Sequence, residues 1–258
     1  MMQRSPAYYF ALSLLLINIS QAQAEGCSAQ SKPYIVPLLE LYTSEGCSSC
    51  PPADKWLSNL NTESTKVTPL AFHVDYWNYI GWQDRFSKAE YSSRQRKLAT
   101  NAVGFVYTPQ FVLNGKDFRA WNSTRLTQAT DRIHALPAAA NLQLAAESLS
   151  TGEITLKAIA NIQDSAIAKR ADVFVALYEN KLVSKVNAGE NNGSELHHDY
   201  VVRELFGAYP MHTLNAFNKQ FNLTSAWQKR DAGAVMFVQD RQTGAVLQSL
   251  ALQFCQEE

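Results

Sequence analysis

Residues 35–52 read IVPLLELYTSEGCSSCPP, and this stretch decides the fold. It begins with an apolar run that holds one acid, Glu40, and turns polar at residues 43–46. A continuous apolar run of this kind is typical of a strand buried on both faces. Two prolines follow Cys50, and proline suits the first turn of a helix because the N–H that it lacks has no partner there. The stretch therefore predicts a strand, a loop that contains Cys47, and then a helix.

Strand and helix patterns continue to alternate as far as residue 137. The predicted elements are a strand at 67–74, a helix at 86–101, a hairpin at 110–120 around Asn114-Gly115, and a helix at 123–134. A strand-helix-strand unit gives parallel strands, and a hairpin adds antiparallel ones. Residues 25–137 are therefore predicted to form an α/β domain with a four-stranded mixed sheet covered by helices.

Short alternating segments replace this pattern beyond residue 137. The predicted strands are 141–146, 154–159, 173–178, 182–186, 200–205, 234–238 and 245–252. Because no helical pattern separates them, residues 138–258 are predicted to form an all-β, sandwich-like domain.

The first residues read as an export signal. Arg4 precedes an apolar run at residues 8–19, and Ala22-Gln23-Ala24 offers a small-x-small cleavage site. The run is shorter than the ~20 residues that a membrane-spanning helix needs. We therefore expect residues 1–24 to be a signal peptide, no membrane span after cleavage, and a periplasmic or secreted protein. Lys plus Arg and Asp plus Glu number 23 each, so no net field favours nucleic acid as a partner.

The four cysteines suggest two different roles. Cys47 and Cys50 have C-x-x-C spacing at a predicted strand-to-helix junction, where the helix dipole favours a thiolate. This predicts Cys47 as the nucleophile and Cys50 as the resolving thiol. Cys27 and Cys255 lie near the two ends of the mature chain and are candidates for a structural disulfide in an oxidising compartment.

Two groups of motifs carry a family resemblance. The strand, Cys47-Ser48-Ser49-Cys50-Pro51 and a later Thr108-Pro109 before a strand resemble the thioredoxin superfamily. Residues 40–54, 73–77 and 107–110 more closely resemble a bacterial family of secreted thioredoxin-like proteins of unknown function. The resemblance implies a thioredoxin-like fold over residues 32–137 and a cis peptide bond before Pro109 that shapes substrate access. It also implies a thiol–disulfide oxidoreductase that acts on a protein thiol or disulfide, or on a redox partner, with no cofactor.

The sequence departs from the thioredoxin pattern at two points. Gly46 stands before Cys47 where thioredoxin has tryptophan, and serines separate the two cysteines, so the direction of any redox reaction stays open. Thioredoxin also buries an acid six residues before its first cysteine, whereas Glu40 lies seven before Cys47. A one-residue shift turns a strand side chain to the other face, so Glu40 can transfer protons to the site only if a bulge intervenes.

Other candidate residues have two interpretations each. His73, Asp75 and Trp77 follow the second strand at its carboxyl end, where open parallel sheets form their ligand crevices, so they are candidates for supporting the site. Alternatively, His73 is a core residue and the aromatic side chains pack between domains. His197-His198-Asp199 is more readily interpreted as solvated surface than as a metal site.

Three alternative functions remain open at this stage. Cys47, Cys50 and His73 could bind copper(I) in a soft trigonal site. The thioredoxin-like unit could be the scaffold of a non-catalytic binding protein. The C-x-x-C pair could also be a short structural disulfide.

Overall fold

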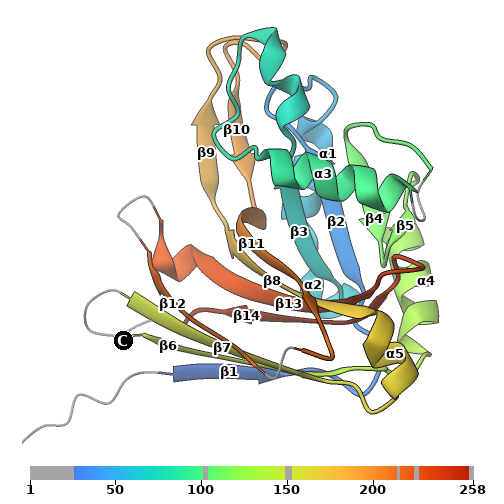
Figure 1. The fold of residues 1–258 in the computed structure, drawn as a ribbon. Helices are drawn as coiled ribbons and strands as arrows, with labels where there is room; N and C mark the ends of the chain where they lie inside the picture. Colours follow the sequence, from blue (N-terminus) through green and yellow to red (C-terminus); the bar gives the residue numbers. More distant parts are fainter. Residues whose placement is uncertain (1–25, 101–103, 149–152, 214–215, 224–226, 256–258) are drawn as a thin grey trace, which may run out of the picture.

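The computed structural model describes residues 26–100, 104–148, 153–213, 216–223 and 227–255 (Figure 1). The predicted signal peptide, residues 1–24, lies outside this part of the chain. The described part is a mixed α/β structure with several sheets in which strands predominate. No helix in it is both long enough and apolar enough to cross a membrane.

Up to residue 134 the predicted strands and helices occur in the predicted order, and the described chain adds an unpredicted first strand and two unpredicted short helices. The elements are β1 (Gly26–Gln30), β2 (Leu38–Thr43), α1 (Pro51–Ser58), α2 (Thr62–Thr65), β3 (Thr68–His73), a 3₁₀ helix (Asp75–Ile80), α3 (Ala89–Leu98), β4 (Gln110–Leu113), β5 (Lys116–Asp117) and α4 (Ser123–His134).

Strands dominate after residue 134. They are β6 (Asn141–Ser148), β7 (Glu153–Asn161), β8 (Ala171–Glu179), β9 (Leu182–Lys185), β10 (Glu195–His198), β11 (Val201–Pro210), β12 (Phe217–Asn222), β13 (Ala232–Asp240) and β14 (Val246–Gln253). A short helix, α5 (Ser165–Arg170), and a 3₁₀ turn (Lys229–Asp231) interrupt the series that we expected to be purely strands.

The central sheet is larger than predicted. Among the described residues it has eight strands in the order β14-β13-β8-β11-β3-β2-β4-β5. The four strands predicted for the first domain form one end of it, with β2 parallel to β3 and antiparallel to β4. The sheet continues because β11 pairs in parallel with β3, where Ala71 N donates to Tyr200 O at 2.8 Å. The predicted domain boundary after residue 137 remains a prediction, and this sheet contains strands from both sides of it.

A second sheet packs against one half of the first. It has the strand order β1-β6-β7-β12, and its inward side chains form one core cluster with those of β8, β13 and β14. Leu142 and Leu156 are examples from the second sheet, and Val175 and Met236 from the first. The alternation of buried and exposed residues along β7 gives the amphipathic face that this packing requires.

Helices cover the other half of the central sheet on both faces. Side chains of α1 and α4 pack with Leu39, Leu41 and Phe111 on one face. On the opposite face α3 packs over Tyr42 and Phe72. Since β2 and β3 are parallel, their carboxyl ends lie at the same sheet edge, where α1 begins and the β9–β10 hairpin projects (Figure 1).

Candidate functional site

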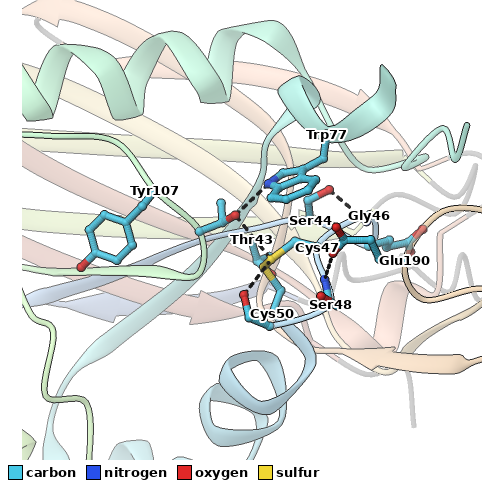
Figure 2. Close-up of a disulfide and its surroundings, with 12 residues drawn as sticks. Thr43, Ser44, Gly46, Cys47, Ser48, Cys50, Trp77, Tyr107 and Glu190 are labelled. Atoms are coloured by element: carbon cyan, nitrogen blue, oxygen red, sulfur yellow. Dashed lines mark hydrogen bonds between the residues drawn. A yellow bond between two sulfur atoms is a disulfide. The ribbon is translucent and has the colours of Figure 1, made fainter. Parts of the chain in front are cut away.

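Cys47 and Cys50 form a disulfide where the chain leaves β2 and enters α1 (Figure 2). Their Cα atoms are 5.4 Å apart. Pro51 and Pro52 occupy the first turn of α1, so two of the four backbone N–H groups that a helix usually leaves free are missing. Cys47 is 1% exposed and Cys50 0% exposed, so neighbouring residues cover both.

Thr108 and Pro109 lie beside this disulfide. The peptide bond between them is cis, as the resemblance implied. Thr108 Oγ1 donates to Cys47 Sγ at 3.4 Å and accepts from Trp77 Nε1 at 2.8 Å. The structure thus brings Trp77 to the dithiol, together with the residues expected to shape substrate access.

Trp77 also explains the glycine before Cys47. A Cβ built on Gly46 would approach Trp77 Cβ and Ile80 Cδ1 to 3.2 Å each. Glycine therefore lets the 3₁₀ helix pack directly on the cysteine loop. The aromatic cover of this site comes from Trp77, and residue 46 contributes only space.

Glu40 and Asp75 have their contacts elsewhere. Arg94 of α3 binds Glu40 through Nε at 2.7 Å and Nη2 at 3.0 Å, on the sheet face opposite α1. This agrees with the one-residue shift along β2. Asp75 accepts a hydrogen bond from Ser92 Oγ and helps fix the 3₁₀ helix to α3.

A buried cluster of five titratable side chains lies at the same end of the sheet as the disulfide. His73 Nδ1 and Asp84 Oδ2 are 2.7 Å apart. Glu45 accepts from Trp82 Nε1 at 2.7 Å, and His198 Nε2 lies 3.4 Å from Glu45 Oε1. Asp54 completes the cluster, with His198 Nδ1 at 4.0 Å. None of these five side chains is more than 6% exposed.

The cluster shifts the pKa values of its members in different directions. Burial alone would lower the pKa of His73, but the charge and hydrogen bond of Asp84 outweigh it and raise the pKa to about 8. Burial would raise the pKa of Asp84, but His73 holds it below its ordinary value. Burial raises the pKa of Asp54, only partly opposed by His198. Asp84 is therefore the ionised partner of a protonated His73. Asp54 is the acid of the buried cluster whose pKa is raised above its ordinary value.

Asp54 was not among the residues expected from the sequence. It lies four residues after Cys50, and this spacing places both on one face of α1. Thr43 Oγ1, at the end of β2, donates to Asp54 Oδ2 at 3.1 Å. The i, i+4 spacing was visible in the sequence and could have identified Asp54 as a neighbour of the second cysteine.

The β9–β10 hairpin contributes three further residues to the site. Asn191 Nδ2 donates to Glu45 O at 2.8 Å and to Cys47 O at 3.1 Å. Glu190 Oε2 accepts from Ser48 N at 3.0 Å (Figure 2). His198 is the third residue. Because these residues are far from the cysteines in sequence, no local motif indicated them.

The solvated-surface interpretation of the histidine pair is wrong for His198. Along β10 the side chains alternate, so Leu196 and His198 are buried whereas His197 is exposed. The period-two pattern of a strand was the signal that separates the two histidines.

Within the described ranges, no group of three or more His, Cys, Asp or Glu side chains has an arrangement that could hold a metal ion.

Cys27 and Cys255 form a second disulfide with Cα atoms 5.7 Å apart, joining β1 to the segment after β14.

Comparison with known proteins adds a family. A family profile described as "Protein of unknown function (DUF1223)" matches residues 38–239. The chain belongs to this family. None of the curated proteins compared with the chain matches it.

Solved structures of similar fold include two bacterial proteins. A crystal structure of a protein from Agrobacterium tumefaciens is 20% identical, with a TM-score of 0.59 over 88% of this chain and 98% of that one. HBP35 of Porphyromonas gingivalis is 16% identical, with a TM-score of 0.60 over 87% of this chain and 76% of that one. At these identities the likeness concerns the fold alone, so the DUF1223 chain has to be interpreted from its own residues.

Proposed function

We propose that this DUF1223 protein is an exported thiol–disulfide oxidoreductase on a thioredoxin-like scaffold at residues 32–137, acting on protein thiols or disulfides. The observation that supports it most is the Cys47–Cys50 disulfide at a strand-to-helix junction, where Thr108 Oγ1 donates to Cys47 Sγ. Two disulfides and the predicted signal peptide favour a periplasmic or secreted location.

The oxidised site reacts in two exchange steps. A substrate thiolate attacks Cys47 Sγ, a new S–S bond forms, and Cys50 leaves with the electron pair of the old bond. A second substrate thiolate then attacks the substrate sulfur, and Cys47 leaves as a thiolate. The substrate dithiol loses two electrons and two protons to become a disulfide, and the protein gains two thiols. The same steps in reverse reduce a substrate disulfide.

The leaving thiolate of Cys50 needs a proton because its site is closed to water. Cys50 is 0% exposed, and Asp54 faces the same side of α1. Burial raises the pKa of Asp54, so this carboxyl group holds a proton more readily than an exposed aspartate. In the proposed mechanism Asp54 takes the proton-transfer role that the sequence suggested for Glu40, with His198 as its neighbour.

The surroundings of Pro109 suit a polypeptide substrate. Tyr79 is 82% exposed, and its ring stacks beside that of Trp77. Trp77 in turn donates a hydrogen bond to Thr108, the residue before Pro109. Phe105 and Val106, just before the cis-proline, are 47% and 38% exposed. Exposed apolar side chains close to a reactive centre favour contact with another protein chain over a small polar molecule.

The deciding experiment is the equilibrium reduction potential of the Cys47–Cys50 pair. It would be titrated against glutathione in a Cys27→Ser, Cys255→Ser variant, with Cys50→Ala added as the control. We expect a reversible two-electron transition between about −120 and −270 mV. A potential below about −300 mV without reaction toward a disulfide substrate would mean a structural bridge and refute the proposal.

A further inference from the structure

The tip of the β9–β10 hairpin places a carboxylate beside the loop that holds the Cys47–Cys50 disulfide. Glu190 Oε2 accepts from the backbone N–H of Ser48, the residue that directly follows Cys47 (Figure 2). Hydrogen bonding from the side chain and the backbone of Ser48 keeps the pKa of Glu190 below its ordinary value, so the Glu190 side chain is negative at neutral pH. The side chain of Glu190 is exposed, so its charge lies in solvent beside the cysteine loop.

The hairpin tip is held firmly in this position. Asn191, 8% exposed, donates to the carbonyl oxygens of both Glu45 and Cys47. On the other side, Gly189 has a φ of +73°, and a Cβ there would approach Ile80 Cδ1 to 3.0 Å. The backbone on both sides of Glu190 is therefore packed against the site, and the carboxylate is a fixed part of it.

The charge of Glu190 is available to an incoming molecule. In the described part of the chain its carboxylate forms no ion pair. The titratable side chains beneath the loop are buried, where His73 pairs with Asp84 and His198 lies between Glu45 and Asp54. A cation near Cys47 thus finds an unpaired negative partner on the surface, whereas an anion is repelled.

We infer that Glu190 makes the site selective for thiol and disulfide substrates that carry a positive charge beside the reacting sulfur. This inference rests on the proposed function. In the reducing direction, the Cys47 thiolate attacks one sulfur of a disulfide that carries cationic groups. The S–S bond of the substrate breaks, and one half of the substrate leaves as a thiolate that keeps its cationic group. Cys50 then attacks Cys47 Sγ and releases the other half of the substrate, also as a thiolate. Two electrons pass from the protein to the substrate, and each released thiolate takes up a proton.

The test compares small disulfides of opposite charge. The reduced full chain is mixed with cystamine, which is cationic, or oxidised glutathione, which is anionic, and each reaction is quenched with acid. Alkylation and mass spectrometry then quantify oxidised Cys47–Cys50 separately from Cys27–Cys255. The measured quantity is the ratio of the second-order rate constants for oxidation by cystamine and by oxidised glutathione. A change in the exposure of Cys47 or in its thiolate fraction alters both rate constants equally and therefore leaves the ratio unchanged.

We expect Glu190→Gln to lower the cystamine-to-glutathione ratio by about fivefold at low salt, and Glu190→Lys to lower it further. The wild-type ratio should itself fall with increasing ionic strength. Glu195→Gln is the matched control, since Glu195 is an exposed acid on the same hairpin that lies beside His197. It should leave the ratio unchanged.

The outcomes separate this inference from the function beneath it. If both disulfides oxidise the wild-type pair but Glu190→Gln leaves the ratio unchanged, or Glu195→Gln lowers it equally, the selectivity of Glu190 is refuted and the oxidoreductase stands. If neither disulfide oxidises wild-type Cys47 and Cys50, the proposed function fails and the inference fails with it.

Discussion

The imidazole of His198 reaches from β10 to within 3.4 Å of the Glu45 carboxylate, two residues before Cys47. In the described structure neither of its ring nitrogens forms a hydrogen bond, and Glu45 Oε1 also has no hydrogen-bond partner. A buried histidine between two carboxylates is thus part of the environment of the dithiol.

His198 should matter far more for stability than its neighbour. His198→Asn replaces a buried imidazole beside two buried carboxylates with a smaller side chain, so we expect the free energy of unfolding to fall by about 1–3 kcal/mol. His197→Asn, on the exposed side of the same strand, should change it by less than about 0.5 kcal/mol. Urea denaturation of the two variants measures both values. Equal losses would contradict the role assigned to the buried histidine.

Asp54→Asn should slow the reaction without changing the shape of the side chain. An amide cannot deliver or accept a proton, so we expect the exchange step at Cys50 to be at least about tenfold slower. The pH dependence contributed by Asp54 should also disappear. Stopped-flow measurement of mixed-disulfide resolution between pH 5 and pH 9 would detect both effects, with Glu63→Gln in α2 as a control acid. An unchanged rate and profile would exclude Asp54 as the proton carrier.

The Glu40–Arg94 pair should act on stability and leave the redox chemistry alone. Arg94→Met leaves a buried carboxylate unpaired, and we expect a loss of about 3–5 kcal/mol. Adding Glu40→Leu should restore much of it, because the double variant has no unpaired charge. A double-mutant cycle in urea measures the coupling, and purely additive losses would argue against the pair. The folded double variant should keep the wild-type reduction potential, since the pair lies on the sheet face opposite α1.

The His73–Asp84 pair predicts a defined pH dependence of stability. The pKa of His73 is about 8 in the folded protein against an ordinary 6.5, so folding favours its protonated form. The resulting stabilisation is fully present below pH 6.5 and is lost as the pH rises through about 8. It amounts to about 2 kcal/mol, since each pKa unit corresponds to about 1.36 kcal/mol.

Urea midpoints between pH 6 and pH 9 test this prediction. Wild-type stability should fall across that window, and the fall should be much smaller in His73→Gln. Because that variant loses a buried contact, the NMR titration of His73 in the wild-type protein provides a second measurement. A His73 pKa below 6.5 would contradict the prediction.

Local sequence pattern was sufficient for the main strands and helices in the first half of the fold, but not for β1 or α2. The apolar run of β2, the prolines at the start of α1 and the Asn114-Gly115 turn each act over a few residues, so they could be interpreted directly. The pairing of β11 with β3 could not, because hydrogen bonds between backbones carry no side-chain signature. This pairing is the reason that the sheet exceeds its predicted size.

The candidate site divides in the same way. Cys47, Cys50, Thr108, Pro109 and Trp77 were expected from motifs, and the structure brings them together. The spacing argument also indicated that Glu40 faces away from the helix. Glu190, Asn191 and His198 come from a hairpin whose docking depends on tertiary packing, and neither strand pattern nor composition predicts where a hairpin docks.

The position of this hairpin late in the chain has a consequence for biosynthesis. A polypeptide emerges from the ribosome amino end first, so Cys47 and Cys50 leave the tunnel well before β9, β10 and β11 exist. Until then the nascent chain has an open β3 edge, and its two thiols lack both their acidic neighbour Glu190 and the cover of Asn191. The thiols of the nascent chain therefore differ from those of the folded protein in nearby charge and in exposure when they first meet an oxidant.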